Sequence, residues 1–267
     1  MICDLGSHKL AYDISGPVGG PPVLFGHCFA ANRHYIENQL PVLTRYQTIQ
    51  YDTRGHGESD TPPGAYTLDN LGNDVIGLLD HLQINQTHYV GVSMGGMIGQ
   101  NLALRFPERL LSLSLVNTIS SYEETGRQVW RNWVKKVRQS GVVSLHDELM
   151  TRWFTDDALD QKIPGSIYMK AALKSFSDTS FESIANAIIS DLHYSDRIKE
   201  IQTPTLIVAS PDDPGIPQHA SQLLNDRIRG SQIDWLSPAH HLATLEHPGA
   251  FNAIPVSYTH LTLPTNR

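Results

Sequence analysis

A serine lies between two glycines in the segment Gly91-Val92-Ser93-Met94-Gly95, and this spacing is the first feature that suggests chemistry. Gly-x-Ser-x-Gly alone is a weak motif, but its surroundings are specific. An apolar, β-prone run precedes the serine, and apolar residues at helical spacing follow it up to Pro107. Strand, tight turn and helix are the setting of a nucleophile elbow. We therefore interpret Ser93 as a nucleophile, and the alternative is a Gly-rich turn with a surface serine.

A serine hydroxyl needs a base to accept its proton and an acidic residue to orient that base. In folds with this elbow the order along the chain is serine, then aspartate or glutamate, then histidine. Asp212-Asp213 follows one predicted strand and His240-His241 follows the next. From the residues alone, either member of each pair could complete a triad with Ser93. Adjacent histidines do not converge on one ion, so we expect neither a metal nor another cofactor.

Two backbone N–H groups are the natural oxyanion hole. That of Met94 comes directly after the serine, and that of Phe29 lies in the loop after the apolar run Val23-Leu24-Phe25. Such donors stabilise the negative charge that develops on a carbonyl oxygen under attack. We therefore expect acyl-transfer chemistry at Ser93.

A polar turn, Asp52 to Ser59, follows another predicted strand. Catalysis by Asp52 or His56 is one interpretation. The preferred one is a buried brace for the site, because polar groups held close to a core usually hydrogen-bond one another.

Strands and helices alternate from residue 23 to residue 117, which predicts an α/β fold with a parallel, doubly wound sheet. From about residue 118 to residue 195 the pattern is helical, with about four helices, and the sheet pattern resumes at Thr205. We expect a core of residues 1–117 and 196–253 with a helical cap at 118–195. Residues 254–267 lack a helical period and look like a non-native or irregular tail.

Three of the four tryptophans, Trp130, Trp133 and Trp153, lie in the predicted cap. The simpler interpretation is that they form the core of the cap, since aromatic residues at helical spacing usually do. The alternative is that some of them line a substrate pocket, together with His27 and Cys28 beside the expected oxyanion loop.

The composition argues against several classes of partner. The 267 residues carry a formal net charge of −7, and Lys and Arg form no run, so neither nucleic acid nor an anionic membrane is expected. The only two cysteines, Cys3 and Cys28, make no disulfide framework. No apolar stretch is long enough for a membrane span, and the chain reads as cytoplasmic. The expected partner is a small molecule, with a homodimer left open.

Several of these segments together resemble the α/β-hydrolase superfamily. They are Gly26-His27-Cys28-Phe29, Asp52 to Ser59, Gly91 to Gly96, the Asp-Asp-Pro-x-x-Pro loop, and His-Leu before Leu245-Glu246-His247-Pro248. Within it, the chain most resembles the branch of 3-oxoadipate enol-lactonases, small carboxylesterases, acyl-homoserine lactonases and cofactor-free haloperoxidases or perhydrolases. The resemblance covers residues 8–118 and 203–253.

The resemblance implies a mostly parallel, eight-stranded sheet covered by helices, with the cap inserted between its halves. It selects Asp213, four residues before Pro217, and His241, just before a leucine, and it places the oxyanion donors at Phe29 and Met94. The chain departs from the pattern in two places. Cys28 replaces the usual glycine or serine, and the final helix looks truncated.

The function that these expectations support is a serine hydrolase that cleaves carboxylic esters or lactones through an acyl-enzyme. Carbon–carbon bond hydrolysis and perhydrolysis use the same triad and stay open. A ligand receptor on a hydrolase scaffold is a further alternative. Serine at position 93 argues against the haloalkane dehalogenases and epoxide hydrolases of this fold, which use aspartate there.

Overall fold

One sheet of eight strands organises the computed structural model, which describes residues 1–254. In chain order the strands are β1 (Ile2–Asp4), β2 (Lys9–Ser15), β3 (Pro22–Gly26), β4 (Gln47–Tyr51), β5 (Thr87–Val92), β6 (Leu110–Val116), β7 (Thr205–Ala209) and β8 (Gln232–Trp235). Their order across the sheet is β1-β2-β4-β3-β5-β6-β7-β8. The pairs β1–β2 and β2–β4 are antiparallel and all others are parallel, which confirms the expected mostly parallel eight-stranded sheet.

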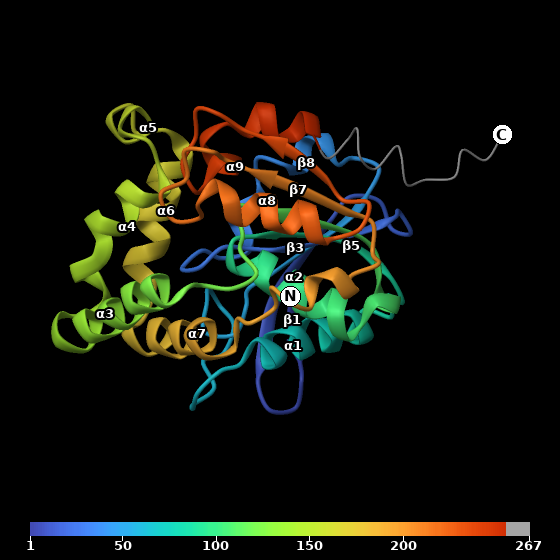
Figure 1. The fold of residues 1–267 in the computed structure, drawn as a ribbon. Coiled ribbons are helices and arrows are strands. Elements are labelled where there is room, and N and C mark those ends of the chain that lie inside the picture. Colours follow the sequence, from blue (N-terminus) through green and yellow to red (C-terminus); the bar gives the residue numbers. More distant parts are fainter. Residues whose placement is uncertain (255–267) are drawn as a thin grey trace.

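Helices cover both faces of the sheet (Figure 1). Those outside the cap region are α1 (Leu68–His81), α2 (Met94–Arg105), α8 (Gln218–Arg227) and α9 (Ala243–Glu246), and residues 248–254 are also helical. Helix α2 packs tightly on one face, where a methyl group at Gly99 would touch Tyr89 and Leu113. Val90, the neighbour of Tyr89 in β5, faces the other side and lies beside Phe251. This alternation along β5 buries both faces, as a parallel sheet requires.

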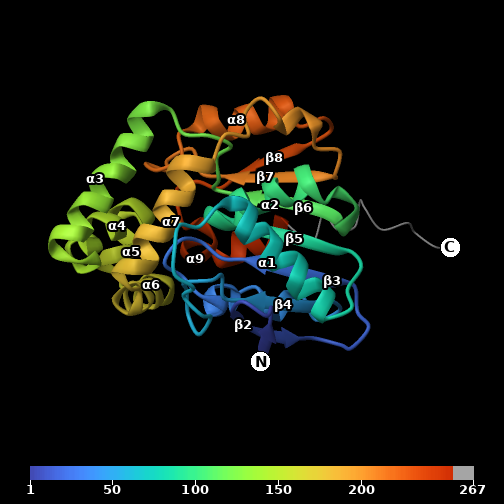
Figure 2. The ribbon, with the colours of Figure 1, turned by 90° about the horizontal axis from the view of Figure 1, so that it is seen from below.

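The insertion between β6 and β7 is helical and projects to one side of the sheet (Figure 2). Its helices are α3 (Glu124–Ser140), α4 (His146–Trp153), α5 (Asp156–Asp160), α6 (Pro164–Ser175) and α7 (Asp178–Asp191). This fully described stretch therefore holds five α-helices, where the sequence pattern indicated about four. The extra helix, α5, is a short turn capped by the Thr155 side chain and has no apolar stripe that sequence periodicity could detect.

The remaining turns of helix are short. They are the 3₁₀ segments Arg33–Ile36, Leu40–Val42, Pro107–Arg109, Val142–Leu145 and Ile198–Glu200. From the sequence alone, residues 36–43 look like one short helix. The structure has only the end of the first 3₁₀ segment and the whole of the second in that range, because Pro41 has no N–H to donate and disfavours α-helical geometry at Leu40.

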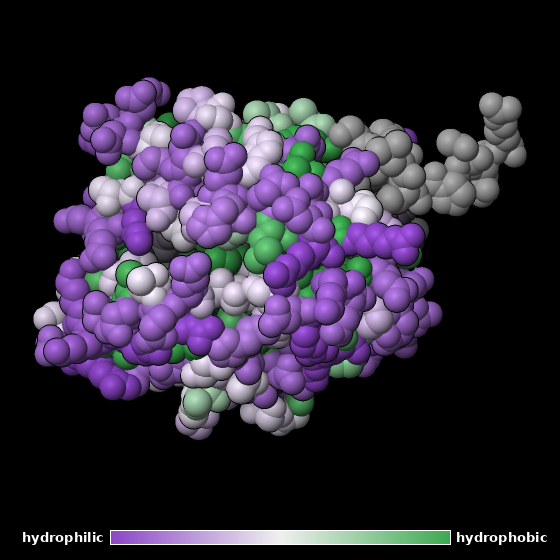
Figure 3. Space-filling model, in the orientation of Figure 1, coloured by the Kyte–Doolittle hydropathy of each residue, from purple (hydrophilic) through white to green (hydrophobic). Residues whose placement is uncertain are grey.

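On the face shown in Figure 3, hydrophobic residues form small separate patches among hydrophilic ones. No helix within residues 1–254 is long and apolar enough to cross a membrane. The predicted irregular tail falls almost wholly on residues 255–267, outside the described residues. The homodimer stays a prediction.

Candidate active site

Ser93 lies at the sharp turn between β5 and α2. Its backbone has φ 53° and ψ −111°, a region that L-residues rarely adopt. The turn is held by the Ser93 N–H, which donates to the Val116 carbonyl at 2.8 Å, and by the Thr118 hydroxyl, which donates to the Ser93 carbonyl at 2.7 Å. Strain of this kind persists only where its surroundings enforce it, and it is common at functional sites.

The glycines of the motif are required by backbone packing. A Cβ at Gly95 would overlap the carbonyl group of Gly26, and a Cβ at Gly91 would overlap the carbonyl group of Gly95. The elbow can therefore close against β3 only if both residues lack a side chain.

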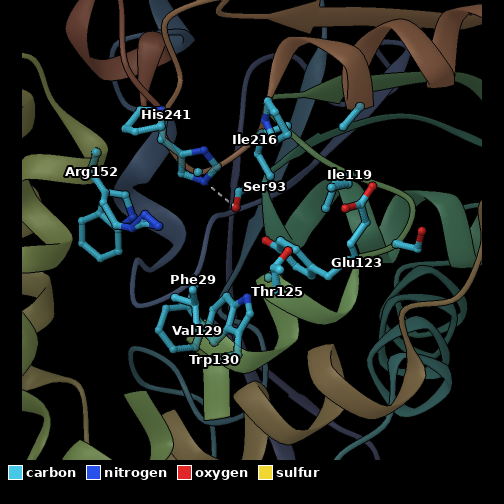
Figure 4. Close-up of a pocket in the computed structure, with 18 of the residues that line it drawn as sticks. Phe29, Ser93, Ile119, Glu123, Thr125, Val129, Trp130, Arg152, Ile216 and His241 are labelled. Carbon is cyan, nitrogen blue, oxygen red and sulfur yellow. Dashed lines mark hydrogen bonds between the residues drawn. The ribbon is translucent and has the colours of Figure 1, made fainter. Parts of the chain in front are cut away.

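The structure brings Ser93, His241 and Asp213 together (Figure 4). Ser93 Oγ lies 2.8 Å from Nε2 of His241, and Nδ1 of His241 lies 2.7 Å from Oδ2 of Asp213. The two neighbouring candidates point elsewhere. Asp212 is exposed and accepts a hydrogen bond from the Ser237 hydroxyl, and Nδ1 of His240 lies 3.2 Å from the Thr151 carbonyl. The geometry thus separates the members of each adjacent pair.

Asp213 is held as a buried carboxylate. Oδ1 accepts hydrogen bonds from the N–H groups of Gly215 at 2.7 Å and Ile216 at 3.0 Å. Burial by itself raises the pKa of Asp213, but the charge of His241 and the hydrogen bonds from His241, Asn117 and Gly215 outweigh it, and the pKa lies below its usual value. Asp213 therefore stays ionised near neutral pH and fixes the Nδ1–H tautomer of His241.

Asn117 belongs to this arrangement, and sequence reasoning missed it. It follows β6 with φ 42°, and its N–H donates to the Val208 carbonyl at 2.8 Å. Its Nδ2 donates to Oδ2 of Asp213 at 3.1 Å. A polar residue directly after an apolar parallel strand was the available signal, since that sheet edge is where sites form in open α/β sheets.

The two expected oxyanion donors are the backbone N–H groups of Met94 and Phe29. Met94 is the first residue of α2, and Phe29 lies in the turn after β3. Neither N–H has an acceptor among residues 1–254. The turn is closed by the N–H of Ala31, which donates to the Cys28 carbonyl at 3.2 Å. An oxyanion hole requires N–H donors without an acceptor of their own, so Phe29 and Met94 stay the predicted pair.

Two buried histidines brace this turn. Nδ1 of His27 lies 2.8 Å from the Cys28 carbonyl, while Nε2 accepts the N–H of Thr53. Nε2 of His56 accepts the N–H of Ala30 at 3.2 Å. Burial lowers the pKa of both rings, which keeps them neutral and able to accept. The bracing interpretation of the polar turn thus agrees with the contacts of His56.

Asp52 supports the same region. It is fully buried, and Oδ1 accepts the N–H of Arg33 at 2.6 Å. Oδ2 accepts hydrogen bonds from Nη1 of Arg33 at 2.6 Å and from the N–H of Glu58 at 2.7 Å. Both carboxylate oxygens of Asp52 accept hydrogen bonds from these donors, and Asp52 makes no contact with Ser93. Its role is therefore structural.

A cavity of about 480 Å³ opens over Ser93 between the sheet edge and the insertion. Its apolar wall comes from both parts and includes Phe29, Ile119, Val129, Trp130, Trp133, Leu149, Trp153 and Ile216. The tryptophans of the insertion are buried and also line the cavity, so both interpretations of them apply. His27 and Cys28 are not among the lining residues. Their expected place in the pocket wall was wrong, because the turn of residues 28–31 directs Phe29 to the cavity instead.

Within residues 1–254, no group of three or more His, Cys, Asp or Glu side chains is arranged to hold a metal ion. The elbow between a parallel strand and a helix, with an aligned serine, histidine and aspartate, is the arrangement of an α/β hydrolase. The apolar cavity above the serine agrees with this class.

Residues 21–248 match the family described as the alpha/beta hydrolase fold, and the chain belongs to this family. It is 34% identical over 244 residues to 3-oxoadipate enol-lactonase 2 of Acinetobacter baylyi, which covers 91% of this chain and 90% of that protein. It is 30% identical to 3-oxoadipate enol-lactonase 1 of the same organism, over 94% of this chain and 93% of that one. The crystal structure of the enol-lactonase from Burkholderia xenovorans superposes with a TM-score of 0.93 at 26% identity, over 97% of this chain and 100% of that one.

Proposed function

We propose that the protein is a serine hydrolase that cleaves carboxylic esters or lactones through an acyl-enzyme, with Ser93, His241 and Asp213 as its catalytic triad. The observation that carries the proposal is the hydrogen-bonded chain from Ser93 Oγ through His241 to Asp213 at the base of an apolar cavity. The names of the two enol-lactonases from A. baylyi add support for lactones among the substrates.

In the first half of the reaction, Nε2 of His241 takes the proton of Ser93 as Oγ attacks the substrate carbonyl carbon. The carbonyl oxygen becomes negatively charged and accepts hydrogen bonds from the N–H groups of Phe29 and Met94. His241 then gives its proton to the departing alkoxide, which leaves as an alcohol. In a lactone this alcohol stays attached to the acyl group.

In the second half, water takes the place of the alcohol. His241 accepts a proton from the water, the resulting hydroxide attacks the acyl-enzyme, and Ser93 leaves with the proton from His241. Asp213 stays ionised throughout and stabilises the imidazolium that forms twice per turnover.

The test is hydrolysis of a matched panel of p-nitrophenyl esters of rising chain length, simple lactones and acyl-homoserine lactones by the wild type and Ser93→Ala. We expect Ser93→Ala to lower kcat by at least about 10⁴-fold, because the nucleophile is lost while binding and the oxyanion donors remain. The control is Ser140→Ala, which changes an exposed serine at the end of α3 and should retain full activity. A folded Ser93→Ala with wild-type rates would refute the proposal.

The same panel ranks the substrates. A lactone preference of about 100-fold in kcat/KM, equal to about 2.7 kcal/mol, would assign a lactonase. A preference for short esters would assign a carboxylesterase. A folded wild type that turns over no member of the panel would also refute ester and lactone cleavage.

A further inference from the structure

Strand β6 lies between β5 and β7 in the sheet, so the residues that follow it lie between the nucleophile and the acid (Figure 2). Ser93 follows β5, and Asp213 lies in the loop after β7. Asn117 and Thr118 come directly after β6. The Thr118 hydroxyl donates to the Ser93 carbonyl, and the Asn117 amide donates to the Asp213 carboxylate. The first two residues after β6 therefore hold both ends of the proposed triad.

The side chain of Asn117 contacts the turn that carries Asp213 at two points. Nδ2 lies 3.1 Å from Oδ2 of Asp213 and 3.1 Å from Oγ of Ser210. The N–H of Asp213 donates to the Ser210 carbonyl at 3.2 Å and closes this turn. The backbone of Asn117 is held by its own N–H, which donates to the Val208 carbonyl at 2.8 Å. The amide therefore joins the end of β6 to both ends of the turn.

Oδ2 of Asp213 is the oxygen that faces the base. Nδ1 of His241 lies 2.7 Å from it, so His241 and Asn117 share one acceptor. The other oxygen, Oδ1, accepts the N–H groups of Gly215 and Ile216. Without the amide, Oδ2 would keep His241 as its one donor among the described residues. A carboxylate with fewer donors is less firmly oriented, and it binds a proton more readily.

The carbonyl oxygen of the same amide has no partner. Asn117 is 1% exposed, and its Oδ1 accepts no hydrogen bond from any described residue. A buried acceptor without a donor destabilises a folded protein. The reverse orientation of the amide would place Oδ1 against the Asp213 carboxylate, where two acceptors repel each other. The amide thus directs its donors to the acid and leaves its own acceptor unsatisfied.

Asn101 shows how a buried asparagine is held elsewhere in the protein. Its Nδ2 also donates to one carboxylate and one hydroxyl, those of Asp69 at 2.7 Å and Tyr194 at 2.8 Å. Its Oδ1, in contrast, accepts Nη1 of Arg105 at 3.2 Å. Of these two similar amides, the one beside the triad has the unpartnered carbonyl. This difference indicates that the position of Asn117 serves the acid more than the stability of the fold.

We propose that Asn117 is a positioning residue of the triad, which holds Oδ2 of Asp213 toward Nδ1 of His241. This inference rests on the proposed function. His241 becomes positively charged in each half of the reaction, and an acid already held in place stabilises that charge without having to reorient. Asn117 is not among the residues that line the cavity, so its effect on the rate passes through Asp213.

The test is a double-mutant cycle on the ester or lactone that the wild type hydrolyses fastest. Asn117→Gly removes the amide, and glycine accommodates the φ of 42° at this position. We expect kcat/KM to fall by about 10-fold or more, as for the loss of a hydrogen bond to a charged group. In the Asp213→Ala background the same change should alter the residual kcat/KM by less than about 2-fold, because residues that act as a unit are not additive. Equal fold losses in both backgrounds would show that Asn117 acts independently of the acid, and would refute the proposal.

The matched control is Asn101→Ala, since alanine suits the interior of α2. This variant loses hydrogen bonds to the same two kinds of acceptor at a buried position away from the cavity. It should be less stable than the wild type in urea denaturation and keep the wild-type kcat/KM. If Asn101→Ala and Asn117→Gly lose kcat/KM to the same extent, the effect belongs to any buried asparagine and the positioning role is wrong.

A second variant, Asn117→Asp, decides the matter if Asn117→Gly does not fold. Aspartate has the shape of asparagine and also tolerates a positive φ. Two buried carboxyl groups about 3 Å apart do not both ionise readily, so at low pH one proton stays between them and replaces the amide donor at Oδ2. The ratio of kcat/KM for Asn117→Asp to that for the wild type should therefore fall between about pH 5.5 and pH 9.5, as this proton is lost. A ratio that does not fall would contradict the proposal.

Taking this ratio isolates the new carboxyl group, because the other charged or titratable side chains of the cavity are the same in both proteins. They are Tyr122, Glu123, Arg152, His219 and His241.

Failure of the proposed function gives a different result. If the wild type hydrolyses no ester or lactone, or if Ser93→Ala keeps wild-type rates, the proposed function itself fails. If Ser93→Ala is inactive while Asn117→Gly has the wild-type kcat/KM, the triad stands and the role of Asn117 is refuted.

Discussion

The carboxylate of Glu246, at the end of α9, reaches the insertion and accepts the N–H of Thr155 at 3.2 Å. The Thr155 hydroxyl donates to the same oxygen. The other oxygen accepts the N–H of His240 at 3.1 Å. One half-buried carboxylate therefore joins the insertion to the residue before His241.

Glu246→Gln should weaken this junction, because an amide has only one oxygen and its NH₂ group would face an N–H donor. We expect a loss of about 1–3 kcal/mol of stability. Because the same side chain positions the loop of His241, kcat/KM should also fall. Thermal denaturation and ester hydrolysis measure the two effects. Glu108→Gln, at an exposed position, should change neither. Wild-type melting of Glu246→Gln would contradict the structural assignment.

The elements that could be predicted from the sequence are those that local patterns specify. The elbow at Ser93 and the alternation of strands and helices led to the sheet and to the order serine, aspartate, histidine. Asp213 and His241 could be distinguished from their neighbours only through the family resemblance. The reason is physical, since adjacent residues share the same local pattern and differ in the direction of their side chains.

The features that could not be predicted depend on contacts between distant segments. Asn117 reaches Asp213 across 96 positions of the chain. Glu246 reaches Thr155 across 91. Arg152 has no motif, and its place in the cavity follows from the packing of α4 against the loop of His241. His27 and Cys28 were placed in the pocket because they are neighbours of Phe29, but the turn points only Phe29 that way.

The close approach of Gly95 to Gly26 allows a direct test of the elbow. In Gly95→Ala the new methyl group would overlap the Gly26 carbonyl, and backbone atoms on both sides leave little room for adjustment. We expect a loss of stability at or above the upper end of the about 1–3 kcal/mol range for overpacking, and a larger loss of activity because Ser93 shifts. Urea denaturation and ester hydrolysis are the measurements.

The matched control is Gly249→Ala, in the helical segment 248–254. A methyl group there would meet no atom within 4 Å. Alanine favours a helix over glycine by about 0.5–1 kcal/mol, so this variant should be as stable as the wild type or more stable. Equal stability of Gly95→Ala and Gly249→Ala would show that the elbow does not need its glycine.

The buried, neutral histidines predict how stability changes with pH. Burial holds the pKa of His56 well below its usual value near 6.5, and the neighbouring His27 ring lowers it further. As the pH falls below 6.5 the unfolded chain binds protons that the folded protein does not, so the stability present above that pH is lost. For His56 alone the loss between pH 7 and pH 5 is up to about 2 kcal/mol. His56→Gln should be less stable than the wild type at pH 7, because the amide loses the stacking of the imidazole ring on Phe176, but its stability should depend less on pH. Urea denaturation of both proteins at several pH values between 7.5 and 5 measures the two slopes. Parallel slopes would mean that His56 takes up its proton in the folded protein as readily as in the unfolded chain.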